Sequence, residues 1–518
     1  MAIFFRDVVE RISSLAILGL LSASSPAIAT PLTSNGLVDE WGYSPTGQSN
    51  SGYAGEVTGI GDFNGDGVPD FAVAAGGWVR CTNCQRQGAV FIYLGDGTFA
   101  LGTSPDYVLY DDLPLNAPGT GFGTHVGGGD FDNDGYSDVV VSAIYDKGTG
   151  SGTTQVGAIH VFYGRVGVPG ANTIITPNWR YTGFSDYYPT GVATGANTGL
   201  YYGWGLATNV DTNCDGFKDI VVSTAYAHSS TTPYLGQVDV FYGSGTRFSG
   251  THNPDWHQNG PEYLIEFGWG LSAIGNFNGD TRQVGEATYE CEDVVVGAPR
   301  TGYYNLYRGS TFILRGAYPN PVLGSRFDFT AQNGARYGEY LGAPGDVNGD
   351  GYDDFLVGSP VYDESGYTDT GRVWLVTGNS SGTNSMGSAV ASPVFQASSN
   401  FGRAVGGTGR VPLGPTMSET DLNGDGCADF AIGQNRYDNS SLLDEGRMWV
   451  YLGCQSETDL TQADYWIEGD VWTGDMAVSI SSTGDLDGDG HNELLAGAAS
   501  YDLPNSFNNG RVWVIDLP

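Results

Sequence analysis

Apolar residues along the chain occur in two short patterns. Some segments alternate apolar and polar positions, as at 158–163 and 372–376, and others are unbroken apolar runs that end in small residues, as at 139–143 and 294–299. Alternation with a period of two is typical of a half-buried strand, and a short apolar run bounded by turn residues is typical of a buried one. The pattern therefore predicts an all-β protein built from many short strands.

One nine-residue sequence stands between these strands in seven copies. It reads Asp-Phe-Asn-Gly-Asp-Gly-Val-Pro-Asp at 62–70, and the other copies begin at residues 130, 211, 276, 346, 421 and 485. Each copy follows a Gly-rich strand and precedes an apolar strand, an alternating strand and a more polar fourth strand. Four short strands per unit match one propeller blade. The sequence therefore predicts a single domain over residues 30–518, a seven-bladed β-propeller with four-stranded antiparallel blades.

The strand count also predicts how the ring closes. After the seventh loop only two strands remain, near 493–498 and 511–515, so the last blade lacks its outer strand. The segment 37–43 precedes the first unit and has no blade of its own. We expect this N-terminal strand to complete the last blade, which removes an otherwise open sheet edge.

The repeated loops have the spacing of a site for a hard divalent cation. Oxygen-bearing side chains stand at positions 1, 3, 5 and 9 of the nonapeptide, Gly stands at position 6, and the backbone carbonyl of position 7 adds a ligand. Because no side-chain ligand is Cys or His, Ca²⁺ is favoured over zinc, and Mg²⁺ rarely takes an all-protein cage. An EF-hand is excluded, because it needs Glu at position 12. That position is Val73, Val141, Val222, Val357, Ile432 and Ala496 in the six complete copies.

The fourth copy is degenerate. It begins with Asn276, has Thr281 at position 6, and carries an insertion that delays its final acid to Asp293. We therefore expect six calcium sites and a weak seventh. The predicted ligands, with position 7 acting through its carbonyl, are Asp62, Asn64, Asp66, Val68, Asp70; Asp130, Asp132, Asp134, Tyr136, Asp138; Asp211, Asn213, Asp215, Phe217, Asp219; Asn276, Asn278, Asp280, Asp293; Asp346, Asn348, Asp350, Tyr352, Asp354; Asp421, Asn423, Asp425, Cys427, Asp429; and Asp485, Asp487, Asp489, His491, Glu493.

The pattern resembles the FG-GAP repeats of integrin α-subunit propellers and of bacterial secreted proteins. Phe122-Gly123 and Phe401-Gly402 match the FG element, Gly297-Ala298-Pro299 matches GAP, and 358–360 nearly matches it. The resemblance covers about residues 36–518. It implies a propeller whose calcium loops join the first and second strands on one face, with partners bound on the opposite face. This sequence departs from the integrin pattern in two ways. It has a predicted calcium loop in nearly every blade, and it has no leg or transmembrane segment.

The net charge of the chain limits the classes of partner that we expect. The 518 residues include 58 acidic and 21 basic groups, a net charge of −37. Nucleic acid and anionic membranes require basic surface, so neither is an expected partner. Bound cations would neutralise part of this charge.

The first 29 residues predict export. Arg6 and Arg11 precede an apolar run over 12–21, and an Ala-x-Ala site ends at Ala29. This is the pattern of a secretory signal peptide, and the apolar run is shorter than a membrane-spanning helix requires. We expect a secreted or cell-surface protein without a membrane anchor, and a monomer.

Six cysteines in an exported chain predict disulfides. Cys427 opens the second strand of its blade and Cys454 ends the antiparallel third strand, so both should lie at the calcium edge and pair. Cys214 and Cys291 belong to loops of neighbouring blades and are a second expected pair. The remaining two, at 81 and 84, are close enough to close a small loop. The alternative to the two predicted disulfides is that their four cysteines are free buried thiols.

The expected ligand face is formed by loops opposite the calcium edge, near 78–87, 184–204, 226–235, 300–308 and 362–370. Their aromatic residues either form a surface for a glycan or peptide, or pack between blades. These residues are Tyr187, Tyr188, Tyr201, Tyr202, Trp204, Tyr303, Tyr304 and Tyr307.

Two classes of function fit the sequence. The first is a non-catalytic adhesion or recognition module for an extracellular protein or glycan, and no catalytic residue or organic cofactor is assigned. The second is a polysaccharide lyase or hydrolase, and a structural cell-surface component is a third possibility. Common hydrolase and nucleotide motifs are absent, and His252 and His257 near Asp255 are too loosely spaced to define a site.

Overall fold

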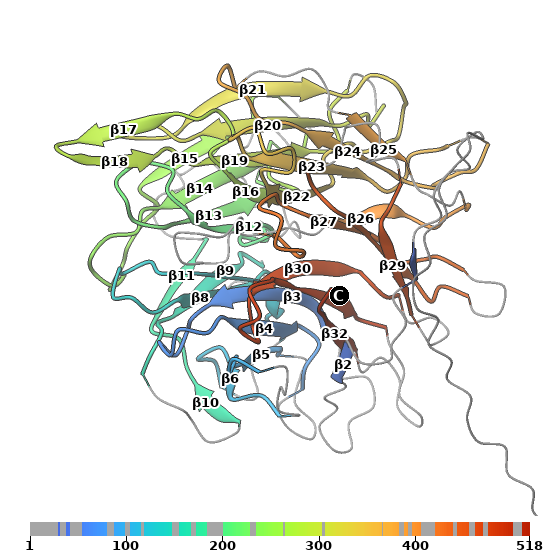
Figure 1. The fold of residues 1–518 in the computed structure, drawn as a ribbon. Coiled ribbons are helices and arrows are strands. Elements are labelled where there is room, and N and C mark those ends of the chain that lie inside the picture. Colours follow the sequence, from blue (N-terminus) through green and yellow to red (C-terminus); the bar gives the residue numbers. More distant parts are fainter. Residues whose placement is uncertain are drawn as a thin grey trace, which may run out of the picture.

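The computed structural model describes most of the chain from residue 54 onward and two short N-terminal segments (Figure 1). The described residues are 30–31, 38–41, 54–79, 87–98, 104–114, 119–147, 155–166, 172–183, 200–227, 235–262, 265–302, 306–364, 366–382, 388–391, 396–405, 420–438, 443–454, 462–469, 475–500 and 510–517. All regular elements within them are β-strands, arranged as a seven-bladed propeller, so the predicted fold is confirmed. The predicted signal peptide at 1–29 and the Cys81–Cys84 loop lie outside the described residues.

Each blade is one sheet whose first three strands follow chain order from the inner strand outward. The blades are β3 (Ala54–Gly61), β4 (Asp70–Ala75), β5 (Ala89–Tyr93) and β6 (Tyr107–Leu109); β7 (Phe122–Gly129), β8 (Asp138–Ala143), β9 (Ala158–Phe162) and β11 (Trp179–Thr182); β12 (Leu206–Val210), β13 (Asp219–Thr224), β14 (Gln237–Phe241) and β15 (Trp256–Asn259); β16 (Leu271–Gly275), β19 (Asp293–Ala298), β20 (Ser310–Arg315) and β21 (Val322–Asp328); β22 (Tyr340–Gly345), β23 (Asp354–Ser359), β24 (Arg372–Val376) and β25 (Ser388–Ala391); β26 (Phe401–Val405), β27 (Phe430–Gln434), β28 (Arg447–Tyr451) and β29 (Tyr465–Glu468); and β30 (Ser479–Gly484), β31 (Glu493–Ala498), β32 (Arg511–Ile515) and β2 (Val38–Trp41). We number them blades 1 to 7 in this order.

The N-terminal strand closes the ring as predicted. β2 pairs antiparallel with β32, with Val38 opposite Ile515 and Trp41 opposite Val512. It occupies the outer edge of blade 7, which would otherwise have three strands. The two ends of the chain therefore share one blade.

Two blades carry an additional outer strand that the sequence did not predict. β10 (Thr173–Ile175), from the connection between β9 and β11, pairs in parallel with β6 of blade 1. β1 (Thr30–Pro31) pairs in parallel with β29 of blade 6. Both cover outer edges, so blades 1 and 6 have five strands instead of four.

The insertion in the fourth repeat folds as a hairpin. β17 (Thr281–Val284) and β18 (Ala287–Glu290) pair antiparallel and project from blade 4 (Figure 1). The hairpin returns the chain to Asp293, which begins the second strand of the blade.

The hydrophobic core lies between blades. The second strands of all seven blades are buried along their whole length, because a neighbouring blade covers each face. Seven apolar clusters fill the seven interfaces between neighbouring blades. One of them joins Leu495 and Val514 of blade 7 to Phe71 and Phe91 of blade 1, so the closing interface is packed like the others.

The FG element serves this packing. Phe122 and Phe401 are fully buried. Gly402 has φ +85°, and a Cβ on it would lie 2.6 Å from Val373 Cγ2. Gly is therefore required where the inner strand approaches the third strand of the preceding blade. No described helix is long and apolar enough to cross a membrane.

Candidate metal sites and the opposite face

The nonapeptide loops connect the first strand of each blade to the second. All seven inner strands run in the same direction relative to the ring, so all seven loops lie at one face. The predicted ligands of each loop are therefore close in sequence and also held at a common edge of the blade.

The first loop shows how the backbone organises the carboxylates. Asp62 Oδ1 accepts the N–H groups of Gly65 at 2.6 Å and Asp66 at 3.1 Å, and Asp62 Oδ2 accepts that of Gly67 at 2.7 Å. Asn64 Oδ1 accepts the Asp66 N–H at 2.9 Å, and its amide donates to Asp66 Oδ2 at 2.8 Å. Gly67, at position 6, has φ +90°, a conformation that Gly adopts readily.

The acid at position 9 is buried beneath the loop. Asp70 accepts N–H groups from Phe63 at 2.8 Å and from Gly95 at 2.9 Å. In blades 2 to 6 the position-9 acid accepts an equivalent hydrogen bond, of 2.7–3.0 Å, from the Gly N–H that follows the third strand. In blade 4 this acid is Asp293, which follows the insertion and accepts the N–H of Gly316. The sequence therefore aligned Asp293 correctly despite the insertion.

Burial raises the pKa of every position-9 acid. Desolvation is the largest cause, and neighbouring loop carboxylates raise the pKa further in all of them, while backbone N–H donors lower it. The pKa reaches about 8 for Asp138 and Asp354, about 7 for Asp429 and about 9 for Glu493. A divalent cation would supply a positive charge that favours the ionised form of these carboxylates.

Two loops bring their carboxylates especially close together. One ligand oxygen each from Asp485, Asp487, Asp489 and Glu493 lie within 4.8 Å of one another. The same holds for Asp130, Asp132 and Asp138 in the second loop. Clustered hard oxygen donors of this kind fit Ca²⁺.

The second loop is also contacted by a positively charged side chain from the neighbouring blade. Asp132 stands at position 3, where five other loops have Asn. Arg247 donates from Nε to Asp132 Oδ2 at 2.5 Å and from Nη2 to Asp134 Oδ2 at 2.8 Å. Asp132 Oδ1 is buried and has no hydrogen-bond partner. Arg247 thus occupies the outer oxygens and leaves an inner oxygen available for a cation.

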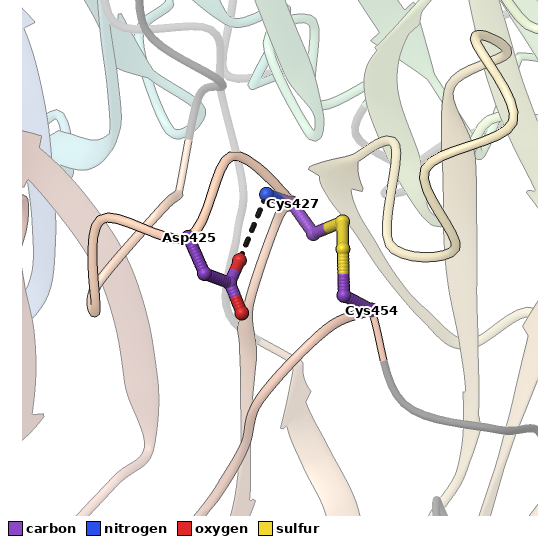
Figure 2. A group of neighbouring side chains, drawn as sticks. All are labelled: Asp425, Cys427 and Cys454. Carbon is purple, nitrogen blue, oxygen red and sulfur yellow. Dashed lines mark hydrogen bonds between the residues drawn. A yellow bond between two sulfur atoms is a disulfide. The ribbon is translucent and has the colours of Figure 1, made fainter.

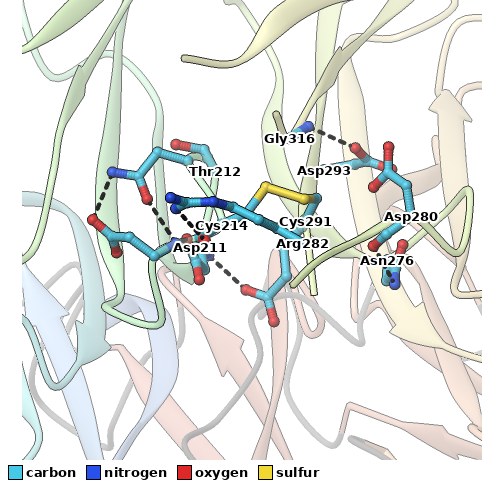
Figure 3. Close-up of a disulfide and its surroundings, with 12 residues drawn as sticks. Asp211, Thr212, Cys214, Asn276, Asp280, Arg282, Cys291, Asp293 and Gly316 are labelled. Carbon is cyan, nitrogen blue, oxygen red and sulfur yellow. Dashed lines mark hydrogen bonds between the residues drawn. A yellow bond between two sulfur atoms is a disulfide. The ribbon is translucent and has the colours of Figure 1, made fainter. Parts of the chain in front are cut away.

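The fourth loop keeps its oxygens together despite its degenerate sequence. Among the described residues, Asn276 Oδ1 and Asp280 Oδ1 are buried without hydrogen-bond partners, and Asp293 Oδ2 also lacks a hydrogen bond of standard geometry. Figure 3 shows Asn276, Asp280 and Asp293 grouped on one side of the Cys214–Cys291 disulfide, with Asp211 of the third loop on the other. Three buried acceptors without partners are consistent with a cation ligand set, so the geometry does not single this loop out as the weak one.

A backbone hydrogen bond joins neighbouring loops at five of the seven junctions between blades. The carbonyl at position 1 accepts the N–H that precedes the position-9 acid of the next blade. These pairs are Asp62 with Ser137, Asp211 with Glu292, Asn276 with Asp353, Asp346 with Ala428, and Asp421 with Asn492, at 2.7–3.4 Å. The geometry of one loop is therefore transmitted directly to the next.

Side chains at position 7 reinforce these contacts. A Cβ on Gly65 would overlap the ring of Tyr136, and one on Gly279 would overlap Tyr352. Each aromatic ring thus covers the position-4 Gly of the preceding loop. This explains why Gly stands at position 4 of these two loops, although the position contributes no side-chain ligand.

Both predicted disulfides are present at this face. Cys214 bonds to Cys291 across blades 3 and 4, and Cys427 bonds to Cys454 within blade 6. Figure 2 shows Asp425 beside the second disulfide, accepting the Cys427 N–H at 3.0 Å. Because the two sulfurs are bonded to each other, this group offers no thiolate to a metal.

Comparisons with known proteins agree with the repeat pattern. The FG-GAP repeat family matches residues 122–162, 340–376 and 477–515, and the FG-GAP-like repeat matches residues 62–141. The chain therefore contains FG-GAP repeats. It is 30% identical to integrin alpha-PS2 of Drosophila melanogaster over 47% of this chain and 16% of that protein. It is 31% identical to human integrin alpha-IIb over 46% of this chain and 20% of that protein.

An enzyme is also among the relatives of this FG-GAP protein. Mouse phosphatidylinositol-glycan-specific phospholipase D is 29% identical over 29% of this chain and 17% of that protein. The chain thus spans a fifth or less of the length of these relatives. A rhamnogalacturonan lyase structure from Bacillus licheniformis aligns over 94% of this chain and 89% of that chain with 14% identity, at a TM-score of 0.32. That score is too low to support any inference.

The FG-GAP propeller has an axial cavity at the face opposite the cation loops. Its volume is about 380 Å³, and residues near the start of the inner strands of all seven blades line it. The predicted aromatic surface is partly found beside it. Tyr201, Trp204 and Tyr226 are half-buried and contact one another, but Tyr202 is fully buried between blades 2 and 3. Tyr187, Tyr188, Tyr303 and Tyr304 lie outside the described residues.

Sequence analysis missed several polar residues at the mouth of this cavity. Glu56 pairs with His125 at 2.9 Å, and Glu339 and Arg403 also line the cavity. No motif marked them. In each repeat we call the Gly that corresponds to the Gly of the FG element the FG-type Gly. His125, Glu339 and Arg403 each follow this Gly by one or two residues, and this shared position was the only feature of the sequence that could have pointed to them. His252 contacts Asp255 at 3.2 Å, within a partly exposed aromatic cluster on blade 3.

Proposed function

We propose that this protein is an extracellular recognition module whose propeller is stabilised by calcium and holds a ligand without transforming it. The observation that carries the calcium assignment is the all-oxygen geometry of the loops, above all the two clusters in loops 2 and 7. The predicted ligands at positions 1, 3, 5 and 9, with the position-7 carbonyl, would hold the ion. A bound Ca²⁺ would neutralise the clustered carboxylates and thereby relieve their repulsion.

The cavity end of the propeller is the proposed ligand face. The loops at the other end are occupied with cation ligands and with hydrogen bonds to their neighbours. The cavity end instead presents half-buried aromatic rings beside charged groups, which is the composition of many ligand pockets. The predicted signal peptide and the two disulfides favour an extracellular location.

Calcium dependence can be tested by melting the protein with Ca²⁺, with Mg²⁺ and after exhaustive chelation. Binding to the folded state stabilises it by about 2.7 kcal/mol per site at a hundredfold excess over Kd. We expect the melting temperature to fall on chelation and to recover with Ca²⁺ more than with Mg²⁺. An unchanged melting temperature, with elemental analysis proving that metal was removed, would contradict the proposal.

Recognition can be distinguished from catalysis by testing whether the bound ligand is chemically changed. Incubation with arrayed glycans and proteins should give binding, and mass spectrometry should recover the bound molecule unchanged. Recovery of cleaved glycan would instead favour the polysaccharide-acting enzyme, the competing class of function.

A further inference from the structure

The axial cavity has two chemically different sides. Trp204 of blade 3 and Trp269 of blade 4 line it with ring centroids 4.8 Å apart, and both are half-buried. Tyr226 packs edge-on against both, at 5.1 Å and 5.8 Å. The aromatic side therefore has a fixed shape before any ligand arrives, which lowers the entropic cost of binding.

The facing side is polar. Glu339 of blade 5 and Arg403 of blade 6 line the same cavity, and each occupies the position after the FG-type Gly that Trp204 and Trp269 occupy in their blades. Glu339 is 9% exposed. Its Oε1 lies 3.4 Å from Arg336, but its Oε2 is buried and has no hydrogen-bond partner among the described residues. A buried acceptor without a donor is costly, so a ligand donor at this point would be strongly favoured.

The remaining wall continues the polar side. Glu56 and His125, from blades 1 and 2, pair with each other at 2.9 Å in the lining. Acidic and basic groups thus alternate around this half of the cavity. A purely apolar ligand would leave Glu339 Oε2 unsatisfied, and a charged ligand of either sign would meet a group of like charge in the lining.

We propose that this cavity binds a neutral saccharide, with the apolar face of a sugar ring against Trp204 and Trp269 and its hydroxyls toward Glu339 and Arg403. Sugar hydroxyls donate to a carboxylate and accept from a guanidinium, while the carbon-bound hydrogens of the ring pack on aromatic faces. A volume of about 380 Å³ is at the lower end of ligand pockets, so the site takes the end of a chain or a short oligosaccharide. This inference rests on the proposed recognition function and names its ligand class.

The test is an array of neutral glycans, acidic glycans and cationic peptides, probed with the full chain in Ca²⁺, followed by calorimetric titration of the best neutral glycan. Trp204→Ala and Trp269→Ala should each weaken binding by more than about tenfold, because each removes an aromatic anchor. Glu339→Gln keeps the shape and should weaken binding less, by about threefold to tenfold. The control is Tyr318→Ala, which removes an exposed aromatic near the cation-loop edge of blade 4 and should leave affinity unchanged.

The outcomes separate the two proposals. Melting in Ca²⁺ must show that every variant is folded. Failure to bind any neutral glycan, or binding that the two Trp variants do not weaken, overturns the saccharide assignment and leaves the calcium-stabilised module intact. Binding of only cationic peptides or acidic glycans also overturns it. Binding followed by cleavage of the glycan keeps the site but refutes a purely recognitive function.

Discussion

Arg247 carries out in the second loop what an Asn amide carries out in the others. In loops 1, 3, 4 and 6 the position-3 Asn donates from Nδ2 to the outer oxygen of the position-5 Asp, at 2.8–3.3 Å. Asp132 has no such donor, and Arg247, from the neighbouring blade, donates to both Asp132 and Asp134 instead. The arginine also cancels the additional negative charge. Loop 7 has Asp487 at position 3, and the structure gives it no arginine partner among the described residues.

This role predicts a calcium-dependent effect of Arg247→Ala. Without calcium, the variant leaves four carboxylates uncompensated and should lose about 1 kcal/mol of stability, the value for a half-exposed ion pair. With saturating calcium the ion supplies the positive charge, so the loss should shrink. Arg326→Ala, which breaks an exposed pair with Glu262 and Asp328, is the matched control. Urea unfolding with and without EDTA measures both variants, and equal losses for Arg247→Ala under the two conditions would refute the role.

Asp239 predicts a pH dependence that is independent of the cation loops. It is buried in β14, and burial raises its pKa to about 7, although hydrogen bonds from Gln237 and Tyr202 lower it. The folded protein therefore retains this proton at pH values where the unfolded chain has lost it. Its contribution to stability is complete below about pH 4 and is lost as the pH rises toward 7.

Asp239→Asn should remove that slope. The variant keeps an acceptor toward Gln237 and does not ionise, so it should gain stability relative to the native protein at pH 8, by at most about 4 kcal/mol at 1.36 kcal/mol per pKa unit. At pH 4 the two proteins should be nearly equal. Urea unfolding across this range in saturating calcium gives the difference curve, and a difference that does not change with pH would show that Asp239 ionises normally.

At the scale of elements, the disulfide between Cys214 and Cys291 makes the third and fourth loops one unit. The β17–β18 hairpin also reaches back to the third loop, because Arg282 donates to the Cys214 carbonyl at 3.1 Å. Glu292, after the hairpin, accepts the Asp211 N–H at 2.6 Å and pairs with Lys218 at 2.9 Å. The position-7 residue of the fourth loop, counted from Asn276, is Arg282, and here a disulfide and an ion pair add to its hydrogen bond to the third loop.

Removing this disulfide should therefore cost more than removing the other one. It joins two blades and spans 77 residues, whereas Cys427–Cys454 spans 27 residues within blade 6. We expect the Cys214→Ser, Cys291→Ser double variant to lose about 2–4 kcal/mol, and the Cys427→Ser, Cys454→Ser control to lose less. Chemical unfolding of both in calcium makes the comparison. A larger loss in the control would contradict the argument.

Much of this architecture could be predicted from the sequence because the repeat sets the register. The nonapeptide located the second strand of every blade, and the strand count placed β2 against β32. The short strands β1 and β10 could not be predicted, because they have two and three residues and pair with distant blades. The hairpin β17–β18 was missed because its residues are polar and mostly exposed, so it lacks an apolar pattern.

The candidate sites differ in the same way. The predicted cation ligands lie within nine residues of one another in six loops, so local spacing was enough to propose them. The cavity lining comes from seven blades, and the place of Glu339 and Arg403 next to the FG-type Gly does not indicate that they share a cavity. Only the closed ring brings these residues together. For the same reason, the sequence alone could not show that Arg247 contacts the second loop, because Arg247 belongs to the neighbouring blade.

At the scale of the whole molecule, stability depends on an unbroken ring. Every blade packs against two neighbours, and the cation loops are hydrogen-bonded from blade to blade on one face. With a net charge of −37, the ring also accumulates repulsion that bound cations would reduce by two charges each. The closing blade is the point at which this circular arrangement depends on one short strand.

The last prediction concerns that strand. Deleting residues 30–45 removes β2, exposes the outer edge of β32 in blade 7, and should lower the melting temperature and promote aggregation, because unpaired strand edges recruit other chains. Deleting only residues 30–36 removes β1 and keeps β2, so it is the matched control and should have a much smaller effect, since blade 6 retains its other four strands. Calorimetric melting and light scattering of both truncations in calcium measure the difference. If the longer truncation melts like the shorter one, the N-terminal strand does not hold the ring closed.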